Sequence, residues 1–192
     1  MVGRFLEIGV IGCGVGGQAV ASLLADAGHR VTVMERFAEA RPIGAGLLLQ
    51  PTGLAVLDRL DGRTAAGRRV IDLQYSALHP AAYGLGLHRG ALFSLLHGRL
   101  HESAARLLTG LEIVDIERDG AHATALDRAG RRYGPFDLLV IADGAHSALR
   151  DRIGLTGRAP VYPWGCVWAV VPDPGGGHSP VPWPNASARP PA

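Results

Sequence analysis

A glycine-rich turn near the start of the chain carries the residues with the clearest chemistry. It reads Gly12-Cys13-Gly14-Val15-Gly16-Gly17 and is followed further along by the acid Glu35. In such a turn the first glycine permits a tight change of direction, the second lets a phosphate approach the backbone, and the third lets a helix pack close to a sheet. A carboxylate at position 35 can accept hydrogen bonds from both hydroxyls of a ribose. The spacing therefore predicts a dinucleotide site.

Three local elements must position these groups. The apolar segment 5–11 predicts a buried parallel strand that ends at the glycine turn. Residues 15–27 have apolar side chains at helical spacing, and Gly28 suits the end of that helix. Residues 30–35 predict a second strand with Glu35 at its carboxyl end. In this order the helix N-terminus offers free N–H groups and the positive end of its dipole to phosphates.

The remainder of the chain alternates strands and helices, which is typical of an α/β fold. Two more helices are predicted, at 51–60 and 89–108. Asp119-Gly120 separates two alternating segments and predicts a β-hairpin. The further predicted strands are residues 47–50, 70–76, 112–118, 122–127, 136–142 and 165–171.

Composition excludes several classes of protein. The 192 residues are 47% hydrophobic and 19% charged, as expected for a globular protein, and the net charge of +2 indicates neither nucleic acid nor an anionic membrane as a partner. All 19 basic residues are arginine, so a lysine Schiff base is excluded. No apolar stretch is long enough to span a membrane. Cys13 and Cys166 form no spaced pair, which favours a reducing cytoplasm.

A second motif narrows the choice of dinucleotide. Asp143-Gly144-x-x-Ser147-x-x-Arg150 follows an apolar strand, and His88-Arg89-Gly90 opens the longest predicted helix. Together with Arg36 and the segment 41–51, these motifs resemble the FAD-dependent aromatic-ring monooxygenases, typified by para-hydroxybenzoate and salicylate hydroxylase. The resemblance covers about residues 5–171.

The resemblance implies a role for each matching residue. Gly12 to Gly17, with Val15 and Gly16 among them, would cradle the FAD pyrophosphate. Glu35 would hold the adenosine ribose, with Arg36 beside it, and Arg89 would reach towards the ribityl–phosphate region. Asp143 and Gly144 match the second cofactor fingerprint. No catalytic side chain is assigned, and His97 and His101 are read as a solvated helix face rather than a metal site.

The resemblance also implies a fold and a function. The fold would be α/β, a Rossmann-like FAD-binding fold with a parallel central sheet, a β-hairpin or meander insertion and a truncated substrate domain. The function would be an FAD-dependent, NAD(P)H-consuming monooxygenase acting on an aromatic or related small molecule. Two alternatives stay open: a truncated, inactive FAD- or ADP-binding module, and another flavoprotein such as a halogenase or isoprenoid reductase.

The family's third fingerprint, a later glycine-aspartate segment, has no counterpart here, so we expect about the first half of such an enzyme. Residues 1–157 would form the FAD-binding domain, within which 61–88 could face the substrate domain. Residues 158–171 would begin the substrate domain. The proline- and glycine-rich residues 172–192 predict a disordered tail. The substrate, the choice of NADH or NADPH and the oligomeric state are left open.

Overall fold

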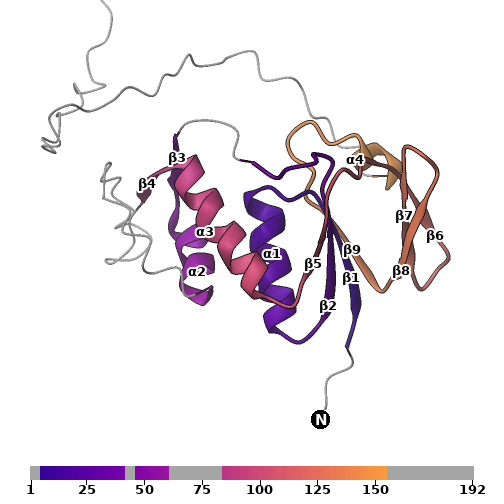
Figure 1. The fold of residues 1–192 in the computed structure, drawn as a ribbon, viewed down its shortest axis with the longest axis horizontal. Helices are drawn as coiled ribbons and strands as arrows, with labels where there is room; N and C mark the ends of the chain where they lie inside the picture. Colours follow the sequence, from indigo (N-terminus) through magenta and orange to yellow (C-terminus); the bar gives the residue numbers. More distant parts are fainter. Residues whose placement is uncertain (1–4, 42–45, 61–83, 155–192) are drawn as a thin grey trace, which may run out of the picture.

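A four-stranded parallel sheet forms the centre of the fold (Figure 1). The computed structural model describes residues 5–41, 46–60 and 84–154. The strand order is β5-β2-β1-β9, with every pairing parallel, which confirms the predicted fold class. The strands are β1 Glu7–Ile11, β2 Arg30–Met34, β5 Arg106–Leu108 and β9 Leu138–Ile141. The chain passes from β1 to β2 on one side and returns as β9 on the other. Open α/β sheets bind ligands where the strand order reverses in this way.

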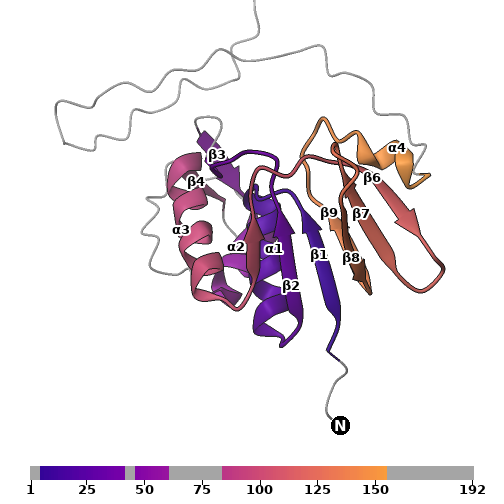
Figure 2. The ribbon, with the colours of Figure 1, turned by 45° about the vertical axis from the view of Figure 1, so that its right-hand side comes forward.

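Two helices cover one face of the sheet (Figure 2). α1 spans Val15–Asp26 and packs against β1 and β2, and α3 spans Arg89–Glu102 and packs against α1. Arg99 on α3 forms an ion pair of 2.7 Å with Asp26 on α1. The buried core of this layer consists of Ile8, Val10, Cys13, Ala21, Val31, Val33 and Leu100.

A three-stranded antiparallel meander packs against the opposite side of the sheet (Figure 1). Its strands are β6 Ile113–Arg118, β7 Ala123–Asp127 and β8 Arg132–Phe136. β6 and β7 form the hairpin predicted around Asp119-Gly120, where Gly120 has a φ of 90°. α4, Leu149–Arg152, closes this layer. The shared core consists of Ile11, Met34, Ile113, Ala125, Phe136 and Leu149.

A smaller unit lies beside α3. β3, Gly46–Leu49, pairs antiparallel with β4, Leu85–His88, and α2 spans Pro51–Arg59. The proline at the first position of α2 agrees with the predicted helix start. β4 was not predicted, because its four residues are too short to show a clear alternation.

The helix predicted over 89–108 is six residues too long. α3 ends at Glu102, where the Oγ of Ser103 donates to the carbonyl of Leu100 and accepts from the N–H of Ala105. Leu107 and Leu108 continue the apolar spacing of the helix, but they belong to β5 and pair with β2. Pairing with a distant strand overrides the local helical pattern here.

The strand predicted over 136–142 is in fact the junction of two strands. β8 ends at Phe136 and β9 begins at Leu138, with Asp137 between them. The N–H of Asp137 donates to the carbonyl of Glu7, and its carboxylate accepts from the N–H of Glu7 at 2.8 Å. The first strand is also shorter than predicted, because it begins at Glu7 and leaves Phe5 exposed.

Several predictions fall on residues outside the described part of the chain. These are the strands at 70–76 and 165–171, most of the segment 61–88 that could face the substrate domain, the substrate-domain start at 158–171, the tail at 172–192, and Cys166. Within the described residues, no helix is both long and apolar enough to cross a membrane.

Asp127 organises the turn between β7 and β8. Its Oδ1 accepts from the N–H groups of Ala129 and Arg131, and its Oδ2 accepts from Nε of Arg131 and the hydroxyl of Tyr133. Burial raises the pKa of Asp127, but these hydrogen bonds outweigh burial and hold the pKa below its ordinary value. Ionised Asp127 therefore stabilises the meander.

We expect Asp127→Asn to lower stability at neutral pH, because an amide cannot accept at all four positions. A depressed pKa in the folded state adds stability above the unfolded pKa of about 4, and this stability is lost as the pH falls through the folded pKa. The difference between variant and wild type should therefore shrink in acid. Urea unfolding at neutral and acidic pH measures it. Glu117→Gln, which removes an exposed ion pair with Arg132, is the control and should change little. A difference that is the same at both pH values would contradict the role of the ionised carboxylate.

Candidate functional site

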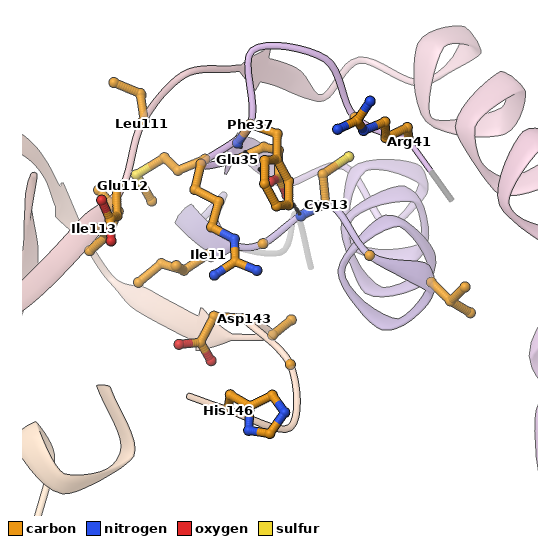
Figure 3. A pocket seen from close by; sticks show the side chains of 18 of the residues that line it. Ile11, Cys13, Glu35, Phe37, Arg41, Leu111, Glu112, Ile113, Asp143 and His146 are labelled. Atoms are coloured by element: carbon orange, nitrogen blue, oxygen red, sulfur yellow. Dashed lines mark hydrogen bonds between the residues drawn. The ribbon is translucent and has the colours of Figure 1, made fainter. Parts of the chain in front are cut away.

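A pocket of about 520 Å³ opens at the carboxyl ends of β1, β2 and β9 (Figure 3). Its lining comes from the glycine turn, the end of β2, the start of α3, the start of β6 and the loop after β9. Eight of the ten predicted cofactor residues line it, namely Gly12, Gly14, Val15, Glu35, Arg36, Arg89, Asp143 and Gly144. The sheet topology thus gathers residues more than a hundred positions apart in the sequence.

The first glycine of the turn is required by the backbone. Gly12 has a φ of 100°, and a Cβ there would lie 2.5 Å from the carbonyl oxygen of Ala142. Its N–H donates to the carbonyl of Met34 at 2.8 Å. A side chain at this position would therefore strain the chain and separate the turn from the loop after β9.

The next glycines of the turn meet different surroundings. Gly14 is the N-cap of α1 and lines the pocket, and a Cβ there would meet no atom within 4 Å. Gly17 is buried away from the pocket, where a Cβ would overlap the carbonyl oxygen of Gly12. Gly16 is exposed and also lies outside the lining. A side chain would therefore meet no protein atom at Gly14, which lines the pocket, but would clash at Gly17, which is buried against the Gly12 carbonyl.

Glu35 is buried at the end of β2, with 7% of its surface exposed. Its Oε2 accepts from the N–H of Cys13 at 2.7 Å, and its Oε1 accepts from the N–H of Phe37 at 3.0 Å. Figure 3 shows its carboxylate between these two residues at the pocket wall. Because each carboxylate oxygen can accept more than one hydrogen bond, both oxygens retain capacity for a ligand hydroxyl.

The thiol of Cys13 lies in the pocket lining but is held in its neutral form. Burial, and then the charge of Glu35, raise the pKa of Cys13 to about 11, against a lowering effect of the hydrogen bond with Gln18. At neutral pH the thiol is therefore protonated and unreactive. It acts as a small residue within the turn.

An arginine and an acid, Arg36 and Glu112, also line the pocket. The guanidinium of Arg36 lies 4.6 Å from the ring centre of Phe37, in a cation–π arrangement. Glu112 also lines the pocket and binds Arg128 through two hydrogen bonds of 2.8 Å. The hydrogen bond with Arg128 holds the pKa of Glu112 below its ordinary value, with the charges of Arg128 and Arg36 adding to the effect.

The loop after β9 forms the opposite wall. Asp143 and His146 lie across the pocket from Glu35 (Figure 3). Gly144 has a φ of 96°, and its carbonyl accepts from the N–H of Ser147. Arg89 contributes from the first position of α3. The Asp-Gly motif thus faces the glycine turn directly.

Several lining residues were not predicted as site residues from the sequence. They include Phe37, Arg41, Leu47, Phe93, Leu111, Glu112 and Ile113. Leu111 is brought there by its N–H, which donates to the carbonyl of Glu35 at 2.8 Å. Such a contact between the loop before β6 and the residue that follows β2 leaves no local pattern in the sequence.

The two histidines of α3 lie apart from this site. Nδ1 of His101 lies 2.8 Å from the carbonyl oxygen of His97, and their rings pack edge to face at 4.3 Å. Burial, and then the charge of His101, lower the pKa of His97. Among the described residues, no group of three or more His, Cys, Asp or Glu side chains is arranged to hold a metal ion.

Comparison with known proteins gives consistent results. The family described as "FAD binding domain" matches residues 6–175. The chain is 30% identical over 164 residues to a probable 2-heptyl-3-hydroxy-4(1H)-quinolone synthase of Rhodococcus erythropolis, covering 77% of this chain and 41% of the relative. It is 32% identical over 174 residues to a 3-amino-4-hydroxybenzoate 2-monooxygenase of Streptomyces cremeus, covering 80% and 43%.

Among solved structures, 2-methyl-3-hydroxypyridine-5-carboxylic acid oxygenase matches with a TM-score of 0.67 and 25% identity, over 79% of this chain and 43% of that one. The chain therefore spans about two-fifths of the length of the relatives it matches.

Proposed function

Because the chain belongs to the FAD binding domain family, we propose that its described residues form the adenosine diphosphate half of an FAD site in a flavin-dependent monooxygenase. The proposed reaction is hydroxylation of a small aromatic substrate with NAD(P)H as electron donor. Relatives with hydroxylase and monooxygenase names support this reaction class.

The single observation that carries the proposal is the meeting of Gly14, Glu35 and the Asp143-Gly144 loop in one pocket at the carboxyl ends of the parallel strands. These residues fit the adenosine diphosphate part of FAD. Open space at Gly14 leaves room for a diphosphate against the backbone, and the buried carboxylate of Glu35 can accept ribose hydroxyls.

Each predicted residue then has a distinct task. The turn from Gly12 to Gly17 and the N-terminus of α1 would bind the diphosphate through backbone N–H groups. Glu35 would bind the adenosine ribose, with the exposed Arg36 at the mouth. Arg89 would pair with the ribityl–phosphate region, where a fixed positive charge opposes the phosphate charge. Asp143 and Gly144 would close the pocket opposite the glycine turn.

When bound, FAD supplies a redox centre that takes two electrons from a reduced nicotinamide and passes them to O₂. In the net reaction, one oxygen atom enters a new C–OH group of the substrate and the other leaves as water. NAD(P)H is oxidised to NAD(P)⁺ and one proton is consumed. The residues described here would hold and orient the cofactor and take no covalent part.

The test is to mix the protein with FAD, remove the free flavin by gel filtration and record the visible spectrum. We expect retained flavin that ADP displaces, and bleaching of its bands by NADH or NADPH. Faster nicotinamide oxidation with hydroxybenzoates would support the aromatic substrate class. A protein that retains no flavin and binds no ADP would contradict the proposal.

Glu35→Gln tests the ribose contact. Only one side-chain oxygen remains in this variant, so either the N–H of Cys13 or that of Phe37 loses its acceptor. We expect stability to fall by about 1–3 kcal/mol and the affinity for ADP to fall roughly tenfold. Urea unfolding and titration calorimetry measure the two effects. Glu117→Gln, on the distant meander, should change neither value, and unchanged ADP affinity in Glu35→Gln would argue against ribose binding by Glu35.

A further inference from the structure

Gln18 is a fully buried amide in α1, beneath the glycine turn. Its side chain has 0% of its surface exposed, and its Nε2 donates to the carbonyl oxygen of Cys13 at 2.8 Å. A carbonyl can only accept, so the amide must face Cys13 with its nitrogen. Its other atom, Oε1, is then left without a hydrogen-bond partner among the described residues.

An unpartnered buried acceptor costs free energy. An apolar side chain of similar size would fill the space between helix and sheet without this cost. The hydrogen bond from the Gln18 amide nitrogen to the Cys13 carbonyl is therefore the interaction that requires a polar side chain at position 18.

The Cys13 backbone is held from both sides. Its N–H donates to Glu35, and its C=O accepts from Gln18. In a trans peptide the N–H points opposite to the C=O. Because the Cys13 carbonyl points towards the buried Gln18, the N–H of Gly14 in the same peptide points the other way, and Gly14 lines the pocket.

We propose that Gln18 is a positioning residue for phosphate binding: its amide fixes the Cys13–Gly14 peptide so that the Gly14 N–H is directed at the diphosphate of an adenine dinucleotide. The inference rests on the proposed FAD site. Gln18 itself does not line the pocket.

The experiment compares Gln18→Met with Ser22→Ala. Methionine keeps the length of the side chain without its donor. Ser22 is equally buried on α1, and its Oγ also has no partner among the described residues, so its loss is a matched control. Calorimetric titration with ADP and with adenosine separates the phosphate contribution from the nucleoside contribution, and thermal unfolding checks the fold.

We expect Gln18→Met to weaken ADP binding by roughly three- to tenfold, the loss of about one hydrogen bond, and to leave adenosine binding unchanged. Ser22→Ala should bind both as the wild type does. Equal weakening for ADP and adenosine, or none for either, would overturn the positioning role. Wild-type protein that binds no ADP would instead overturn the proposed FAD site.

A measurement on the wild type covers the case in which Gln18→Met does not fold. Nuclear magnetic resonance of side-chain amides should find a Gln18 proton that exchanges with water far more slowly than those of the exposed Gln50. ADP should shift the Gly14 amide resonance. Exchange at Gln18 as fast as at Gln50 would overturn the inference.

Discussion

Replacement of Gly14 with alanine is expected to weaken FAD and ADP binding by roughly ten- to hundredfold while the protein stays folded. Gly14 has a φ of −75° and a ψ of −177°, which is extended backbone that alanine adopts readily. A Cβ would meet no protein atom within 4 Å, so the added methyl group strains nothing in the free protein. It would instead occupy the space through which a diphosphate must approach the backbone.

Gly98→Ala is the matched control for this prediction. Gly98 lies in α3, is exposed and is absent from the pocket lining, and a Cβ there also meets no atom within 4 Å. Its replacement should leave ligand affinity unchanged and raise stability by about 0.5–1 kcal/mol, since alanine suits a helix interior better than glycine. Titration calorimetry and urea unfolding give both values. Wild-type affinity in Gly14→Ala would mean that no diphosphate passes over Gly14.

Gly17→Ala is expected to have the larger effect on the fold. A Cβ at Gly17 would overlap the carbonyl oxygen of Gly12, and backbone atoms cannot turn away as a flexible side chain can. α1 would have to move away from β1, which opens the core around Val10 and Ala21. We expect a loss of about 3 kcal/mol or more in the free energy of unfolding.

Urea unfolding compared with Gly98→Ala isolates this steric effect, because both variants add the same methyl group to a helical glycine. Ligand binding should fall together with stability in Gly17→Ala, whereas in Gly14→Ala binding should fall alone. An unfolding midpoint equal to that of the wild type would contradict the close approach of α1 to the turn.

Local sequence patterns were sufficient to predict the structure wherever the conformational preference of a single residue decides it. The positive φ of Gly12 and Gly28, the hairpin at Asp119-Gly120 and the proline that starts α2 all follow from residue type at a fixed position. The strand–turn–helix–strand order that ends at Glu35 follows in the same way. These signals predicted the central elements and eight residues of the pocket.

Non-local pairing explains the incorrect predictions. Leu107 and Leu108 have the spacing of a helix, yet they form β5 because they pair with the edge of β2 that β1 does not occupy. The segment 136–142 suits one strand, yet Asp137 separates two strands that belong to different sheets. Strand pairing depends on partners far away in the chain, so it cannot be predicted from a short segment of sequence.

The class of fold, the glycine turn and the acid that follows β2 could be predicted from the sequence, because each depends on backbone freedom or on periodicity over a few residues. How these groups meet depends on the packing of the whole fold. It brings Leu111 against the backbone of Glu35 and Asp143 across from the glycine turn, and it buries Gln18 beneath Cys13. These contacts arise where parallel strands end side by side, and that adjacency is set by the burial of the whole core rather than by any one segment.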